Sequence, residues 1–119
     1  MARRDSSLGN LERATMNIFW DSDAPLTVRD VAAHFPDHAY TTILTVCDRL
    51  LRKGMLTREL EGRSHRYRPV ANRDAYVSAL IDEALSSIDD RESLLMGFVA
   101  RMSDTDADAL RRALRRRPK

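Results

Sequence analysis

The chain of 119 residues is long enough for one compact domain, or for a small domain with an attached helical element. Its 18 acidic and 20 basic residues nearly cancel, so net charge alone does not indicate a nucleic-acid partner. The single cysteine, Cys47, excludes a disulfide within the chain, and no apolar run approaches the ~20 residues of a membrane span. The basic start leads into no apolar stretch, so we expect no signal peptide and a cytoplasmic protein.

The first part of the chain predicts two short helices. Residues 1–9 have the composition of a polar arm, and Asn10 is expected to cap a helix over residues 11–20. The segment "TVRD" has the form of a capping box, so a second helix is expected to begin at Thr27. Its core-facing side is apolar, and Pro36 is expected to stop it.

A third helix and a β-hairpin follow. Apolar spacing predicts the helix over residues 40–53, with Gly54 at its C-terminal stop. Residues 55–60 and 65–70 are expected to form two strands joined by the turn "EGRS". The order of three helices and a hairpin predicts a winged helix-turn-helix.

The pattern becomes wholly helical after Pro69. Asn72 is expected to cap a long helix reaching about Ser87, a further helix covers about residues 94–102, and "SDTD" from Ser103 caps a last one. These helices carry more apolar residues than they can bury alone, so they require the N-terminal half or a second copy. The predicted fold is mostly α with a small β-hairpin: a winged-helix DNA-binding domain at 1–71 and a helical dimerisation region at 72–119.

The third predicted helix is hydroxyl-rich on its outer side. At ~100° per residue, Ile43, Val46, Cys47 and Leu50 face the core, while Thr41, Thr45, Asp48 and Arg52 lie opposite, flanked by Thr42 and Arg49. Thr is a poor helix former, so three of them need a reason, and base or phosphate contacts of a recognition helix supply one. The alternative is a Thr-rich surface without a partner. Leu44 lies at the border, where it can meet a thymine methyl or seal the core, and Cys47 is expected to be a core residue.

The predicted hairpin is basic. Residues 49–68 contain seven Arg or Lys against two Glu, and Arg63, His65 and Arg66 lie at the hairpin tip and its return strand. A wing that touches phosphates or the minor groove requires such charge, although a solvated face is the alternative. Asp48 would repel phosphate, so it either accepts from a cytosine amino group or, the interpretation we favour, pairs with Arg52.

Four stretches, "LGNLERATMNIFW", "AYTTILTVCDRLLRKGML", "HRYRPV" and "FVARMSDTDADALRRAL", resemble the penicillinase-repressor family of BlaI/MecI type. The resemblance implies a homodimeric repressor of resistance or other genes that binds inverted-repeat operators in double-stranded DNA. It places the recognition contacts on Thr41, Thr42, Thr45 and Arg49, and the wing contacts on Arg63, His65 and Arg66. We also count Tyr40 among the expected DNA-binding residues.

The resemblance also implies a dimer contact and a cleavage site. We assign the dimer contact to Tyr76, Leu80, Leu94, Leu95, Phe98, Leu110 and Leu114. Well-studied members of the family are inactivated by a membrane-bound sensor protease that cuts before the Phe of an "NFVE" segment. The corresponding bond is Gly97–Phe98 in "GFVA", where Gly replaces the Asn. Gly97 either weakens its helix and eases local opening or allows close helix packing. The paired cysteines of copper-sensing relatives have no counterpart near the C-terminus.

No enzyme, metal site or cofactor is expected. The sequence shows no nucleophile–base arrangement or phosphate loop, and Pro36 separates His34 from His38. Two other functions stay open: a winged-helix regulator released by a small ligand, and a winged-helix module that docks a protein. The basic tail from Arg111 to Lys119 is either a solubilising end or a second phosphate contact.

Overall fold

The computed structural model describes residues 8–118, so most of the predicted polar arm and Lys119 lie outside the described residues. Contacts divide the chain into two compact units, Met1–Leu80 and Ile81–Lys119. No helix within residues 8–118 is long and apolar enough to cross a membrane.

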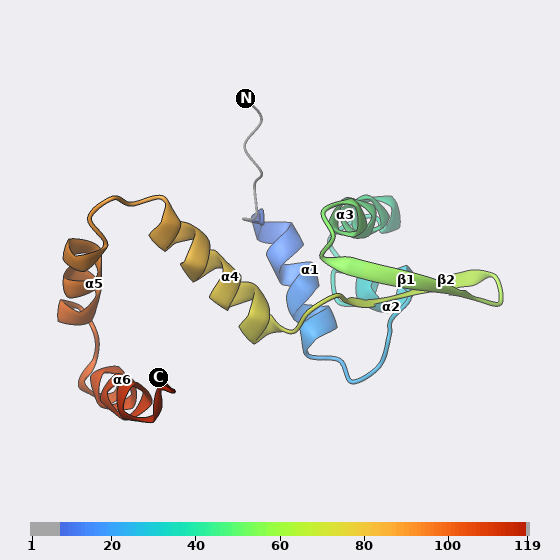
Figure 1. The fold of residues 1–119 in the computed structure, drawn as a ribbon. Helices are drawn as coiled ribbons and strands as arrows, with labels where there is room; N and C mark the ends of the chain where they lie inside the picture. Colours follow the sequence, from blue (N-terminus) through green and yellow to red (C-terminus); the bar gives the residue numbers. More distant parts are fainter. Residues whose placement is uncertain (1–7, 119) are drawn as a thin grey trace. The chain divides into compact units, whose positions relative to one another are not determined.

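Three helices form the first part of unit one: α1 at Asn10–Trp20, α2 at Val28–Ala32 and α3 at Tyr40–Arg52 (Figure 1). The prediction that Asn10 caps α1 is wrong, because Gly9 holds the cap position and donates its N–H to Glu12 Oε1 at 3.0 Å. The capping box of α2 is confirmed. Thr27 Oγ1 accepts from the Asp30 N–H, and the Thr27 N–H donates to Asp30 Oδ2, each at 3.0 Å.

The second helix is shorter than predicted. It ends at Ala32, and the chain then closes with tighter hydrogen bonds from the His34 and Phe35 N–H groups to carbonyls three residues earlier. The change of hydrogen-bond pattern therefore ends the helix before Pro36 can stop it.

The predicted hairpin is confirmed, with β1 at Leu56–Glu61 and β2 at Ser64–Pro69 paired antiparallel. Gly62 supplies the left-handed backbone that the turn needs, at φ 64°. The hairpin tip projects beyond α2 and α3 in Figure 1. Leu26 bridges the outer edge of β2, because its N–H and carbonyl exchange hydrogen bonds with Tyr67 at 2.9 and 2.7 Å.

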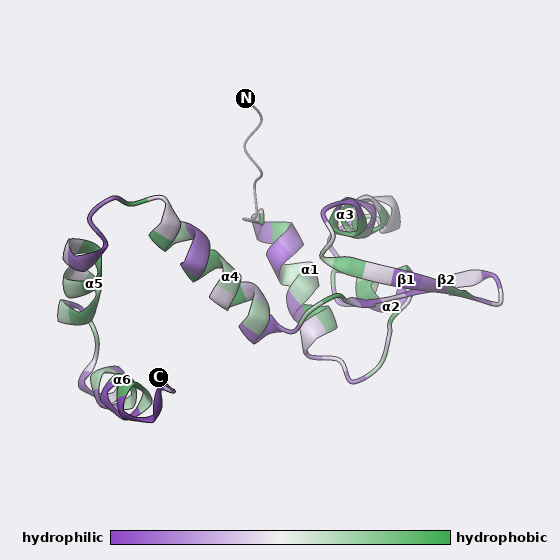
Figure 2. Ribbon diagram, viewed as in Figure 1, coloured by the Kyte–Doolittle hydropathy of each residue, from purple (hydrophilic) through white to green (hydrophobic). Residues whose placement is uncertain are grey.

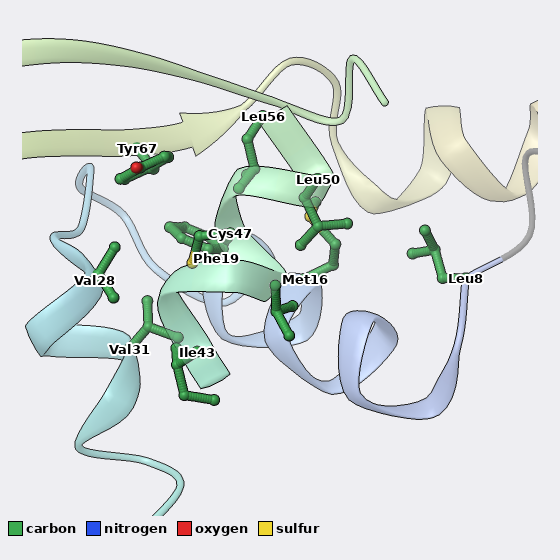
Figure 3. Close-up of a cluster of buried hydrophobic side chains, with 11 residues drawn as sticks. Leu8, Met16, Phe19, Val28, Val31, Ile43, Cys47, Leu50, Leu56 and Tyr67 are labelled. Carbon is green, nitrogen blue, oxygen red and sulfur yellow. The ribbon is translucent and has the colours of Figure 1, made fainter. Parts of the chain in front are cut away.

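The core of unit one joins the helices to the hairpin. Figure 3 shows Leu56 and Tyr67 reaching from the strands toward Cys47 and Phe19. The core-facing set predicted for α3 is confirmed, since Ile43, Val46, Cys47 and Leu50 are all buried. Leu8 is also buried, so assigning it to a polar arm was wrong.

The remaining helices are α4 at Arg73–Ser86, α5 at Arg91–Ala100 and α6 at Asp104–Arg116. Asn72 and Ser103 accept from the Ala75 and Asp106 N–H groups, as predicted. α5 begins three residues earlier than predicted, because Asp90 caps it by accepting from the Ser93 N–H at 3.0 Å. None of the three helices contains a buried residue, and much of α5 is coloured hydrophobic in Figure 2.

Candidate nucleic-acid interface

The outer face of α3 is open to solvent. Tyr40, Thr41, Thr42, Thr45 and Arg49 are all exposed, and Tyr40 is 49% exposed. The residue at the N-terminal cap of α3 is Ala39, which has no side chain able to accept from the first N–H groups of the helix. This face presents hydroxyls and one guanidinium on a helix of 13 residues, about 20 Å long.

Thr45 has one hydrogen bond within the helix. Its hydroxyl donates to the Thr41 carbonyl at 2.9 Å. The proton is thereby committed, so the oxygen is directed outward as an acceptor in this rotamer.

Two grooves flank this face, and together they contain all eight predicted DNA-contact residues. The first, here called the α1-side groove, has a volume of about 510 Å³ and is lined by Gly9, Asn10, Leu11, Glu12, Thr41, Thr42, Thr45, Val46 and Arg49. The second, the wing-side groove, has a volume of about 440 Å³ and is lined by Thr27, Val28, Arg29, Asp30, Tyr40, Leu44, Arg63, Ser64, His65, Arg66 and Tyr67.

The predicted DNA-contact residues fall into two groups, one in each groove. The three threonines and Arg49 border the start of α1, whereas Tyr40 borders the hairpin with Arg63, His65 and Arg66. Leu44, 40% exposed, lines the wing-side groove and is not sealed in the core. The recognition helix and the wing therefore meet at Tyr40 and Leu44.

Several basic side chains of α3 and the hairpin are paired within the chain. Arg52 Nη2 lies 2.9 Å from Asp48 Oδ2, which confirms the pairing we favoured from the sequence. Arg66 pairs with Glu61 across the hairpin turn. Arg58 donates to the Tyr67 hydroxyl at 3.1 Å and lies over its ring. These contacts orient the guanidinium groups and partly neutralise two of them.

Arg49, Arg63 and Arg68 have no side-chain hydrogen bond or ion pair to any other residue within 8–118. All three are exposed. A guanidinium without a carboxylate partner keeps its full charge for a phosphate. Arg63 therefore provides unneutralised charge on the wing side of the exposed face, whereas Arg49, on the α1 side, is attracted by the Glu12 carboxylate without a hydrogen bond to it.

A buried carboxylate of α1 contacts the C-terminal end of α3. Glu12 of α1 is 7% exposed, and its Oε1 accepts from Lys53 Nζ at 2.9 Å, directly after the last residue of α3. Burial alone would raise the Glu12 pKa, but the Gly9 N–H, Lys53 and Arg49 together lower the pKa below its usual value. The carboxylate therefore stays charged and ties the two helices together.

The residues assigned to a dimer contact are mostly solvent-accessible. Phe98 is 53% exposed, Leu95 45% and Leu114 58%, while Leu80, Leu94 and Leu110 are half-buried. Tyr76 differs, because its ring packs on Trp20 with centroids 5.3 Å apart. A Cβ built on Gly97 would meet only the flexible Arg101 side chain, at 3.6 Å.

Comparison with known families identifies the family of the chain. Residues 8–116 match the penicillinase repressor family. The chain belongs to the penicillinase repressor family. Two Mycobacterium tuberculosis proteins, both named transcriptional regulator BlaI, from strains CDC 1551 / Oshkosh and ATCC 25618 / H37Rv, are 43% identical to it over 113 residues. Each alignment covers 90% of this chain and 82% of the relative, so this family member is a transcriptional regulator.

Solved structures confirm the fold of this penicillinase-repressor member. The Staphylococcus aureus MepR–DNA complex has a TM-score of 0.51 at 17% identity, covering 90% of this chain and 75% of that one. A MarR family protein from Bacillus stearothermophilus has a TM-score of 0.51 at 18% identity, covering 91% and 71%. At these identities the likeness shows a winged-helix fold alone.

Sequence patterns missed three supporting residues of the interface. Tyr67 anchors the wing, Glu12 supports α3, and Arg73 of α4 reaches back to α1. The alternation of β2 was a usable signal for Tyr67, since an aromatic flanked by two arginines indicates one buried face. The partners of Glu12 and Arg73 lie 41 and 52 residues away, beyond any local spacing rule.

Proposed function

We propose that this protein is a homodimeric repressor that binds an inverted-repeat operator, with α3 in the major groove and the hairpin as a wing on the flanking backbone. The observation that carries the proposal is that the α3 hydroxyls, Arg49 and Arg63 are all exposed and line the two grooves that flank α3. Hydroxyls can bond base edges and phosphates, whereas guanidinium groups supply charge.

Each half of the interface has its own task. Thr41, Thr42 and Thr45 contact bases or phosphates from α3, and Tyr40 continues this surface toward the wing. Arg63 and His65 at the hairpin contact the backbone or minor groove, and Arg66 can exchange Glu61 for a phosphate. Double-stranded DNA is therefore the proposed partner. The likeness to the MepR–DNA complex supports a fold able to carry such an interface.

A second copy is the proposed partner of the C-terminal helices. The exposed apolar residues of this region include Ile81, Leu95, Met96, Phe98, Val99 and Leu114. Apolar surface of this extent is costly in water, and a symmetric dimer removes it. The proposed regions are 1–71 for DNA binding and 72–119 for dimerisation.

Release from the operator is proposed to involve cleavage at Gly97–Phe98 by a membrane-bound sensor protease. Gly97 lies inside α5, where glycine weakens a helix by roughly 0.5–1 kcal/mol relative to alanine. The absence of close contacts at its Cβ position, apart from Arg101, supports local opening over close packing within residues 8–118. Protease access requires such opening.

The decisive experiment selects duplexes from a randomised pool with the wild-type protein and measures mass in solution. We expect enrichment of two inverted half-sites and a mass about twice 13.6 kDa. Enrichment of a single half-site by a monomer would exclude the dimeric mode. Retention of no duplex at low salt would favour a protein-docking module, and release of intact protein by a small molecule would favour a ligand-sensing regulator.

Thr45→Ala tests the recognition helix on the selected duplex. We expect a loss of about 5- to 100-fold in specific affinity with little change on random duplex, because the lost contact reads bases. Alanine has the higher helix propensity, so the loss cannot come from unfolding of α3. Thr105→Ala, at an exposed site in the first turn of α6, is the matched control.

A further inference from the structure

The start of α4 is fastened to the end of α1 by four residues, here called the α4 joint: Trp20, Asp21, Arg73 and Tyr76. Arg73 Nη2 lies 2.9 Å from Asp21 Oδ1 and 3.3 Å from Asn17 Oδ1. The same guanidinium lies over the Trp20 ring, 5.4 Å from its centroid. One side chain thus makes an ion pair, a hydrogen bond and a cation–π contact to a single helix end.

The indole of Trp20 fixes the joint from two further directions. Its Nε1–H donates to the Ala71 carbonyl at 3.0 Å, just before α4 begins. Tyr76, one turn into α4, packs on the ring with centroids 5.3 Å apart. Contacts at residues 71, 73 and 76 therefore fix both the position and the direction in which α4 starts.

The joint lies at the edge of the core, where Trp20 and Tyr76 pack against the core cluster and are only partly buried. No residue of α4 is buried, and the connecting residue Val70 is 60% exposed. An open groove of about 380 Å³ lies against the connecting segment, lined by residues that include Trp20, Val70 and Asn72. Arg73 is also the first residue of α4, where a positive charge is unfavourable beside the positive end of the helix dipole. Its contacts with α1 must offset that cost.

We propose that the α4 joint determines which spacing between half-sites a dimer accepts. This inference rests on the proposed function, because spacing has meaning only for a dimer on two half-sites. α4 has 14 residues and is about 21 Å long, so a swing of about 20° at its start moves its far end by about 7 Å. That distance is about two base pairs at ~3.4 Å each.

The test uses duplexes built from the half-site that the wild-type protein selects: the selected pair, the same pair with the spacer changed by one, two, three or five base pairs, and a single half-site. We expect the wild type to prefer the selected spacing by about tenfold or more over a two-base-pair change. Arg73→Ala should reduce this ratio to about twofold while its affinity for the single half-site stays within about twofold of the wild type. Arg73→Lys should restore part of the ratio, because it keeps the charge beside Asp21.

Arg91→Ala is the matched control, since Arg91 is also an exposed arginine and is the first residue of a helix, α5. The Arg91→Ala variant should keep the wild-type ratio between the affinities for the selected spacing and for the altered spacing. The single tryptophan of the chain lies in the joint, so stronger acrylamide quenching of Trp20 in Arg73→Ala reports that the joint itself has opened, whereas the emission changes with loss of the guanidinium alone. Asp21→Ala removes the ion pair from the α1 side and should broaden the spacing preference in the same direction.

The outcomes separate the two proposals. A wild-type protein that is monomeric or retains no duplex contradicts the proposed function. A dimer that accepts every spacing equally, or an Arg73→Ala variant that opens the joint and keeps the wild-type ratio, overturns the role of the joint and leaves DNA binding standing.

Discussion

Glu12 and Lys53 lie 2.9 Å apart, Oε1 to Nζ, and join the first turn of α1 to the C-terminal cap of α3. The Glu12 side chain is 8% exposed and that of Lys53 32%. The pair is therefore largely shielded from solvent, and its attraction is screened less than that of a surface pair. It fixes the recognition helix against α1 at the end remote from the threonines.

Glu12→Gln should lower the free energy of unfolding by about 1–3 kcal/mol at pH 7, because it removes the charge facing Lys53. The folded-state pKa of Glu12 lies below its usual value of 4.5. The wild type therefore has the higher free energy of unfolding above about pH 4.5. This difference is lost as the pH falls through the folded-state pKa. Urea unfolding of both proteins between pH 3 and 7 measures this, and a constant difference over that range would contradict it.

Thr15→Val should leave stability unchanged or raise it by up to about 1–2 kcal/mol. Thr15 is 0% exposed, and its hydroxyl has no hydrogen-bond partner within residues 8–118. Valine replaces that hydroxyl with a methyl of similar size and has a similar helix propensity. Urea unfolding is the measurement. A clear destabilisation would show that the Thr15 hydroxyl has a partner.

Cys47 should be inert in the folded protein. Burial raises the pKa of its thiol from 9.0 to about 11, so at pH 8 its thiolate fraction is lower by about 100-fold than that of an unperturbed thiol. Labelling with a thiol reagent should be slow and should speed up with urea as the protein unfolds. Fast labelling without denaturant would contradict the core assignment.

The raised pKa of Cys47 predicts a loss of stability at high pH, whereas the lowered pKa of Glu12 predicts a loss of stability at low pH. The folded state favours the neutral thiol, so its contribution to stability is complete below about pH 9 and is lost as the pH rises toward 11. Cys47→Ala, which has no titrating thiol, should show a flatter stability profile over this range.

Arg63→Ala should weaken binding to selected and random duplexes alike, and should reduce the slope of log affinity against log salt by about one. The reason is that Arg63, at the hairpin turn, has no carboxylate partner within residues 8–118 and its charge is available for a phosphate. Gel-shift titrations at several salt concentrations provide the slope, with Arg91→Ala as the control. An unchanged slope and affinity would remove the wing from the DNA interface.

Local sequence rules predicted most elements of the fold. Helix periodicity identified the core face of α3, capping residues located the starts of α2 and α6, and Gly62 marked the hairpin turn. The ion pair Asp48–Arg52 was also predictable, because residues four apart on a helix are neighbours by geometry. These features depend on interactions within a few residues of the chain.

Two wrong assignments near the start of the described chain show where local rules end. Asn10 has the better capping side chain, but Gly9 holds the cap because Glu12 is fixed by Lys53 and can accept its N–H. Leu8 looked like part of a polar arm and is buried in the core. In both cases a contact with a distant segment changes the preference of the local sequence.

The sequence by itself determined which residues of α3 share a face, since that follows from 3.6 residues per turn. Only the tertiary structure decided what lies beside them: α1 next to the threonines and Arg49, and the hairpin next to Tyr40 and Leu44. The pairs Glu12–Lys53 and Asp21–Arg73 depend likewise on the packing of remote segments. Periodicity assigns a residue to a side of its own helix, whereas the burial of apolar surface by the whole chain decides which element packs against that side.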